Sequence, residues 1–206
     1  MKSAVKLLPI IYMVCLSYAL FGQGERRLLM EKDASSVREL YENDMYAAVQ
    51  SEVAGMMLKY EDHIPAHLEM EMQSYYVFSG IRLKQTDIDA LVADFGSRYP
   101  HSPRLALIKF EQSLYYFEKG DYSRSIAVLR GVENKYLSKS QRLEYMFNKA
   151  YCNMRVGDNK EAMAGFKQII ALGKTPYLAP STYYLGYLHY ISNGFPDAVK
   201  MFKNLE

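Results

Sequence analysis

A helix–turn–helix pattern that returns at a nearly constant interval constrains this chain most strongly. Each unit has two segments of helical apolar spacing, separated by a short turn. A small or apolar residue takes the same place on the second segment of every unit. These positions lie 42, 34, 37 and 36 residues apart, at Val49, Leu91, Ser125, Ala162 and Ala198. The pattern predicts a stack of antiparallel helix pairs.

Periodicity, turn residues and prolines set the expected helix boundaries. Gly120-Asp121 and Gly157-Asp158 mark two of the turns, and the Asp158/Glu161 spacing predicts a capping box. We expect five pairs: a helix from residue 35 to the turn at 43–45 with 46–60, 66–83 with 87–99, 105–119 with 122–136, 141–156 with 159–172, and a last pair within 183–202.

The last pair carries the most specific motif. Leu185-Gly186 precedes Ala198 and then Phe202 at spacings that resemble the tetratricopeptide repeat (TPR), although Thr182 and His189 stand where that family has Trp and Tyr. We expect Gly186 and Ala198 to form a close helix contact, with Phe202 filling the gap beside it. In the fourth pair Ala150, Ala162 and Phe166 take these positions.

The resemblance implies an all-α fold, a right-handed superhelical array of antiparallel helix pairs over residues 35–206. It also implies a non-catalytic function in protein binding. The connector at 99–104, Tyr-Pro-His-Ser-Pro-Arg, resembles those of bacterial envelope TPR proteins of the BamD and YbgF type. This similarity suggests a protein or peptide partner and peripheral association with an envelope complex.

The N-terminal residues are typical of a secretory signal. Lys2 and Lys6 precede an apolar run over 7–21, which predicts a signal peptide at 1–22 and a short polar tether at 23–34. An uncleaved membrane anchor is the alternative, but the run is short for one. We therefore expect a periplasmic or outer-membrane-associated protein. Without residues 1–22 the basic and acidic residues balance, so no nucleic-acid partner is expected.

Few residues suggest chemistry. The chain has no Gly-rich phosphate loop, Gly-x-Ser-x-Gly or His-Glu-x-x-His motif. His63 and His67 have the spacing of a metal pair, but Pro65 interrupts the helix that such a pair needs. Cys152 could be activated by Arg155, although burial is commoner for a free cysteine. We expect no catalytic residue, no metal and no cofactor.

The first helices of the last three pairs carry apolar rows at helical spacing. In the family these helices line a concave groove, so the resemblance assigns the rows to partner binding. The alternatives are packing alone, or a tyrosine-rich surface that binds a glycan or small ligand. The nine residues are Phe110, Leu114, Phe117, Phe147, Tyr151, Met154, Tyr183, Tyr187 and Tyr190.

The final helix carries apolar residues on more than one side, among them Val199, Met201 and Phe202. A repeat array ordinarily ends in a helix with a polar outer face. We therefore expect the sequence to belong to a longer protein, or its end to be covered by a partner or a second copy.

Overall fold

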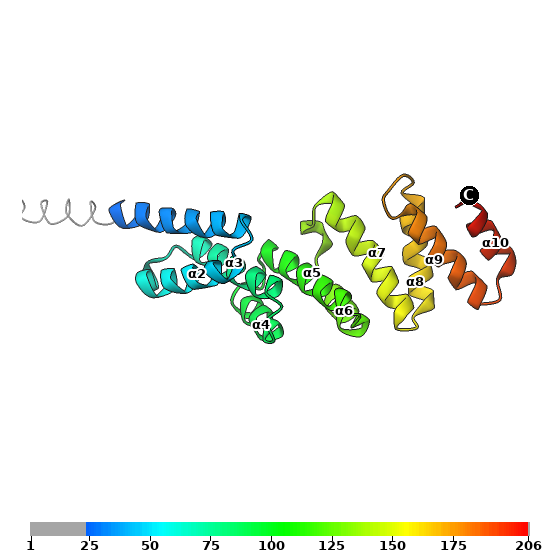
Figure 1. Ribbon diagram of the computed structural model, residues 1–206, viewed down its shortest axis with the longest axis horizontal. Coiled ribbons are helices and arrows are strands. Elements are labelled where there is room, and N and C mark those ends of the chain that lie inside the picture. Colours follow the sequence, from blue (N-terminus) through cyan, green and yellow to red (C-terminus); the bar gives the residue numbers. More distant parts are fainter. Residues whose placement is uncertain (1–23, 206) are drawn as a thin grey trace, which may run out of the picture. The chain divides into compact units, whose positions relative to one another are not determined.

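The computed structural model of the chain describes residues 24–205 (Figure 1). Within this range the chain forms ten α-helices packed in pairs, together with two short 3-10 helices and connecting loops. The predicted all-α class is therefore confirmed. The predicted signal peptide lies outside the described residues.

The described residues up to Leu83 form one compact unit. Its first helix spans residues 24–42, and Met30 and Ala34 on that helix are buried in the core shared with α2 and α3. The segment 24–34, predicted to be a polar tether, is helical here; Met30 and Ala34 pack on these two helices, whereas Leu28 and Leu29 are exposed. The unit continues with α2 (Tyr46–Tyr60), the 3-10 helix η1 (Glu61–His63) and α3 (Ala66–Arg82).

The residues from Lys84 onward form a second compact unit, in which consecutive helices pack against each other. The helices predicted as the second pair, α3 and α4, fall in different units, so the single repeat domain over 35–206 stays a prediction. The second unit contains α4 (Ile88–Arg98), α5 (Pro103–Glu118), α6 (Tyr122–Leu129), η2 (Asn134–Tyr136), α7 (Lys139–Arg155), α8 (Asn159–Ala171), α9 (Leu178–Ile191) and α10 (Phe195–Lys203).

The turn inside each helix pair contains a residue in the left-handed backbone region, which glycine, asparagine and aspartate tolerate best. Asp121 and Asp158 then cap the helices that follow two of these turns, by accepting from the backbone N–H groups of Arg124 and Glu161. The full capping box forms elsewhere, between Ser138 and Gln141. The left-handed turn residues are Asp44, Lys84, Gly120, Gly157 and Asn193.

The return helix of the third pair is shorter than predicted. We expected one helix over 122–136, but α6 ends at Leu129 and a loop leads into η2. Gly131 is a poor helix former, and the loop lets Val132 and Leu137 reach the core around Phe110. Burial of these two side chains competes successfully with continuation of the helix.

Small residues let the paired helices cross closely. At Gly165 on α8, an added Cβ would lie 2.8 Å from the Cβ of Ala150 on α7. We predicted that Gly186 on α9 lies closest to Ala198 on α10. Instead, the atoms nearest to a Cβ added at Gly186 belong to Phe202 and Met201 on α10. The close contact in the last pair is therefore displaced along α10, and Phe202 packs directly against the glycine.

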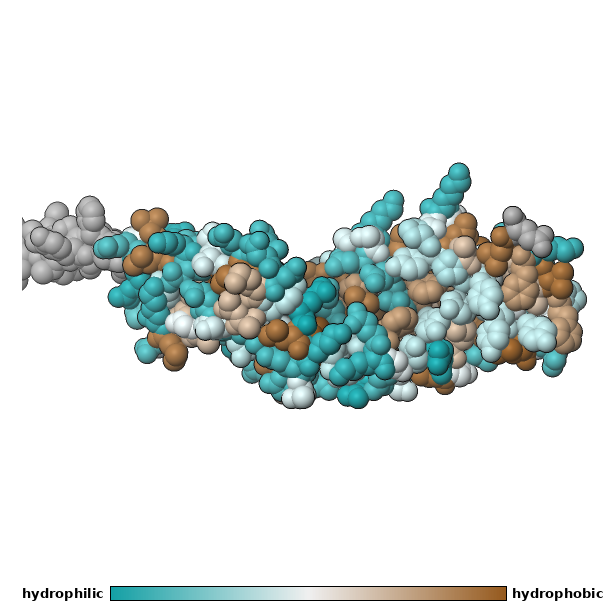
Figure 2. Space-filling view, in the orientation of Figure 1, coloured by the Kyte–Doolittle hydropathy of each residue, from teal (hydrophilic) through white to brown (hydrophobic). Residues whose placement is uncertain are grey.

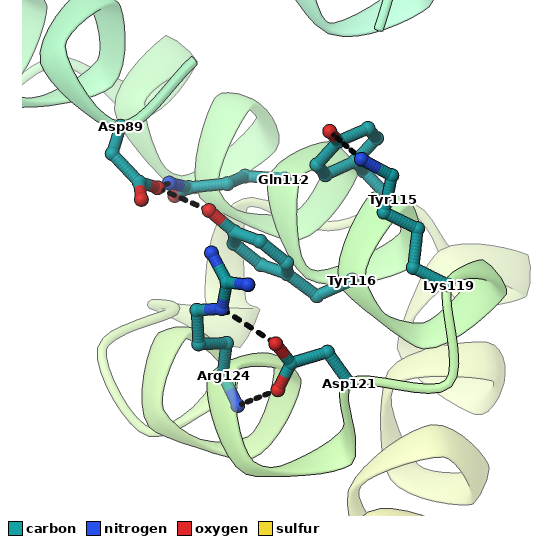
Figure 3. Close-up of polar contacts among 7 residues, drawn as sticks. All are labelled: Asp89, Gln112, Tyr115, Tyr116, Lys119, Asp121 and Arg124. Atoms are coloured by element: carbon teal, nitrogen blue, oxygen red, sulfur yellow. Dashed lines mark hydrogen bonds and ion pairs between the residues drawn. The ribbon is translucent and has the colours of Figure 1, made fainter. Parts of the chain in front are cut away.

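A polar network joins α4 to α5, and Arg124 of α6 lies beside it (Figure 3). The Asp89 carboxylate accepts from the Gln112 amide at 2.7 Å and from the Tyr116 hydroxyl at 2.5 Å. Arg124 lies alongside the Tyr116 ring, 4.7 Å from its centroid, and pairs with Asp121. Burial, followed by the bond to Asp89, raises the pKa of Tyr116 to about 12, so the hydroxyl remains a donor at neutral pH.

The crossing at Gly165 yields a stability prediction. Gly165→Ala should lower the free energy of unfolding by about 1–2 kcal/mol, because overpacking costs about 1–3 kcal/mol and the gain in helix propensity recovers at most about 1 kcal/mol. The matched control is Gly96→Ala in α4, where the new Cβ would meet Leu105 at an ordinary 3.5 Å. Urea unfolding measures both variants, and equal stabilities would show that α7 and α8 do not cross this closely.

Candidate protein-binding surface

The predicted binding residues lie on α5, α7 and α9, and their exposure rises along the chain. Phe110 is buried, whereas Tyr183, Tyr187 and Tyr190 are between 43% and 57% exposed. The intermediate group is half-buried and consists of Leu114, Phe117, Phe147, Tyr151 and Met154. Sequence alone predicted three equivalent rows, so this gradient needs a structural explanation.

Phe110 is a core residue rather than a surface residue. Its side chain is 1% exposed and belongs to a cluster with Ile126, Leu129 and Tyr145. Since α6 and α7 both contribute to this cluster, Phe110 is enclosed by the helices that follow it. A partner cannot reach it in the folded chain, and it drops out of the candidate surface.

The half-buried residues touch the next pair of helices. The Phe117 ring on α5 lies 5.4 Å from that of Tyr151 on α7, and Tyr151 lies 5.1 Å from Tyr184 on α9. The rows on α5 and α7 are therefore each partly covered by the first helix of the pair that follows. The α9 row is the most exposed because no later helix pair lies over it in the described part of the chain.

Some of the row residues belong to a larger aromatic cluster that the sequence did not reveal. Tyr184 links Tyr151 and Phe147 on α7 to Phe166 on α8, with ring centroids 5.1–6.2 Å apart. The four tyrosines of α9 follow each other closely in the sequence, which could have signalled the cluster. Its members are Phe117, Tyr122, Phe147, Tyr151, Phe166, Tyr177, Tyr183, Tyr184 and Phe202.

A cation lies at one margin of this cluster. The Arg155 guanidinium is 4.5 Å from the centroid of the Tyr122 ring and donates to the Tyr151 hydroxyl at 3.2 Å. The bond to Tyr151 raises the pKa of Arg155, so its charge is permanent. Because Arg155 is exposed, this side chain could also bind a carboxylate or carbonyl oxygen of a partner.

An acidic group lies nearer the other end of α7. Burial raises the pKa of Glu144. Tyr177 lies close enough that its own pKa is raised, first by burial and then by the Glu144 charge. Eleven residues separate Glu144 from Arg155, which is about 16 Å along a helix. The aromatic part of α7 therefore lies between an acidic and a basic group.

The remaining chemical candidate is Cys152, which is fully buried. Its thiol donates to the Ser125 hydroxyl at 3.4 Å, and Ser125 donates to the Ser113 carbonyl at 2.9 Å. Burial raises the pKa of the Cys152 thiol, which opposes formation of a reactive thiolate. The structure therefore favours packing over reactivity for this residue.

Among residues 24–205, no cluster of histidine, cysteine or acidic side chains has the geometry of a metal site. Within the same range no helix combines the length and apolar composition needed to cross a bilayer.

Comparison with known proteins supports the fold. No family model matches the sequence, and no curated protein matches it. Among solved structures, MamA of AMB-1 superimposes with a TM-score of 0.65 at 12% identity, covering 86% of this chain and 90% of that one. The TPR-like repeats of a kinesin light chain from Podosopora anserina give 0.60 at 12% identity, with 85% and 92% covered.

A third structure, the apo form of RapI, gives a TM-score of 0.63 at 12% identity and covers 84% of this chain and 51% of that one. Identities at this level establish a shared fold and nothing finer. Together with the helix pairs and their left-handed turns, the likeness shows that this chain has the all-α, TPR-like repeat fold.

Proposed function

We propose that this protein is a non-catalytic interaction module that holds a protein or peptide partner along the aromatic rows of α7 and α9. The observation that carries the proposal is the exposure of Tyr183, Tyr187 and Tyr190 on one side of α9, next to the half-buried Phe147 and Tyr151. In Figure 2, pale and brown side chains gather over the part of this unit formed by α7 to α10. TPR-like folds generally serve such binding.

Tyrosine suits this role for physical reasons. Its ring supplies a large contact area with few rotatable bonds, and its hydroxyl can bond at the edge of an interface. The ring of Tyr151 is already held by Phe117 and Tyr184, so a partner would not need to immobilise it. We expect the partner segment to place apolar side chains on these rings and an oxygen acceptor near Arg155.

We also propose that the protein acts in the bacterial envelope. Lys2, Lys6 and the apolar run that follows support export. The connector at 99–104, with its resemblance to envelope TPR proteins of the BamD and YbgF type, supports a role beside an envelope complex. These sequence features support the proposed localisation, whereas the rows of α7 and α9 support the proposed binding.

The binding proposal predicts site-specific capture of a partner. A photo-crosslinking residue at Tyr187 should trap a protein from the envelope fraction, whereas the same residue at Lys160, exposed on α8, should not. Tyr187→Ala should then weaken binding of the captured protein about tenfold or more, the usual effect at a central tyrosine. Affinity measurements with the purified pair check this.

Tyr136→Ala is the matched control, because Tyr136 is an exposed tyrosine outside the rows. Circular dichroism should show unchanged helicity in both variants, since neither side chain is buried. Equal affinities for the two variants would contradict the proposal. Binding of an oligosaccharide on a glycan array, lost in Tyr187→Ala, would assign the rows to a sugar instead.

The export proposal predicts a processed N-terminus. Protein recovered from the envelope should begin between Leu20 and Gly24, because cleavage follows the apolar run. N-terminal sequencing or intact mass measures this directly. A protein that keeps Met1 and is recovered only from the cytoplasm would disprove export and leave the binding proposal standing.

A further inference from the structure

A polar pocket lies between α7, α8 and η2, on the side of α7 opposite its aromatic row. Lys149 and Asn153 line the pocket, and each is two residues from Tyr151 of the row, which places them about 160° away from it around the helix. The pocket has a volume of about 340 Å³, at the lower end of the range for small-ligand sites. Its polar lining residues are Asn134, Tyr145, Lys149, Asn153, Glu161 and Gln168.

Two features of the chain leave this space open. Asn153 precedes His189 by 36 residues, so it takes the position at which the TPR pattern has a tyrosine, and its side chain is much smaller. The second feature is the early end of α6 at Leu129, after which Asn134 of η2 supplies the rim of the pocket. A small amide and a residue of η2 therefore border the pocket where the repeat pattern predicts a tyrosine and a longer helix.

The repeat fold does not require polar side chains at this place. At the next junction, 36 residues further on, Leu185 takes the place of Lys149 and Met201 that of Gly165. Leu185 is buried in a core cluster, and Met201 packs against that cluster. Both residues also line the hollow at that junction. The polar lining between α7, α8 and η2 is therefore a property of this site rather than of the fold.

One end of the pocket is rich in acceptors. Asn153 is 4% exposed, and no group in the described part of the chain donates to its Oδ1. A buried oxygen without a hydrogen bond is unfavourable, so a ligand donor is stabilised there. Glu161 follows the turn glycine Gly157 by four residues and Asn153 precedes it by four, so the two stand at the same level of the antiparallel helices. The Glu161 carboxylate has no ion pair within residues 24–205, and this end suits an ammonium group.

The other end of the pocket offers a cation. Lys149 precedes Asn153 by one turn of α7, about 6 Å along the helix. Its Nζ donates to the Tyr145 hydroxyl at 3.4 Å, which leaves other N–H bonds of the ammonium group for a ligand. Gln168 lines the pocket from α8, two turns after Glu161, and adds an amide donor. This end suits a carboxylate.

We propose that this pocket binds a free α-amino acid. The ligand's ammonium group donates to Asn153 Oδ1 and to the Glu161 carboxylate, and its carboxylate accepts from Lys149. Ala150 and Gly165 line the pocket beside these groups and leave room for an aliphatic side chain. A ligand with both charges satisfies both ends, whereas an amine or a carboxylic acid satisfies one. The inference does not depend on the proposed function, because the pocket and the aromatic row are on opposite sides of α7.

A thermal-shift screen of the full chain against the proteinogenic L-amino acids at millimolar concentration tests the proposal. At least one amino acid with an aliphatic side chain should raise the melting temperature. Isothermal titration calorimetry then compares it with its amide, which lacks the carboxylate, and with the acid that lacks the amino group; for L-leucine these are L-leucinamide and 4-methylpentanoic acid. Each analogue should bind at least about tenfold more weakly, because it loses a charged hydrogen-bonding group.

Variants of the pocket locate the site. Lys149→Met and Asn153→Leu should each weaken binding at least about tenfold. Lys160→Met is the matched control, because Lys160 is exposed on α8 and lies outside the pocket, and it should leave binding unchanged. Without ligand, Asn153→Leu should not lower the melting temperature, because it replaces a buried unbonded oxygen by an apolar side chain. Should this variant unfold, Lys149→Met decides, since methionine keeps most of the lysine's apolar stem.

Three results would overturn the inference. The first is no thermal shift and no binding heat with any amino acid, which would leave the pocket to water alone. The second is equal affinity of the wild type and the pocket variants, which would place the ligand elsewhere. The third is binding of either analogue as tight as that of the amino acid. The crosslinking experiment at Tyr187 tests a different surface, so the two proposals fail independently.

Discussion

The close crossing of paired helices at small residues is the constraint on which the second unit depends. Ala150 and Gly165 bring α7 and α8 together, and Gly186 admits Phe202 against the backbone of α9. Because the helices approach this closely, large side chains such as Phe166 fill the remaining space completely. Larger residues at the crossings would push the helices apart and leave gaps in the packing, or would strain the neighbouring side chains.

The stacking of successive pairs follows from these crossings. A closely crossed pair presents one side of its first helix to the next pair, and aromatic rings fill that junction. Tyr151 shows both consequences, because it contacts Phe117 before it and Tyr184 after it while part of its surface stays exposed. Under the proposed function, stability and partner binding would therefore be coupled on α7, whereas the more exposed tyrosines of α9 would act in binding with less effect on the fold.

Several buried polar groups in the second unit are hydrogen-bonded to a neighbouring helix. Asp89 accepts from Gln112 and Tyr116 at the start of the unit, and Ser125 on α6 joins Cys152 on α7 to the Ser113 carbonyl on α5. These bonds offset the cost of burying polar atoms. Among the described residues they form structural contacts between helices, with the thiol held in its protonated form by burial.

The sequence by itself determined the local units. Apolar periodicity gave α2 its boundaries, and Gly120 and Gly157 marked two turns, because helix and turn formation depend on residues close together in the chain. It did not reveal that Met30 and Ala34 extend the first helix, or that α6 stops at Leu129, since both outcomes depend on burial against distant segments.

Only the tertiary structure decided which of the predicted binding residues can meet a partner. Phe110, Phe147 and Tyr183 occupy the same position type in the repeat pattern, yet they are buried, half-buried and exposed. The exposed fraction of a side chain depends on the segments that pack around it rather than on the residue itself. The periodic sequence could specify the helical rows, whereas the helices packed over each row set how much of it remains open.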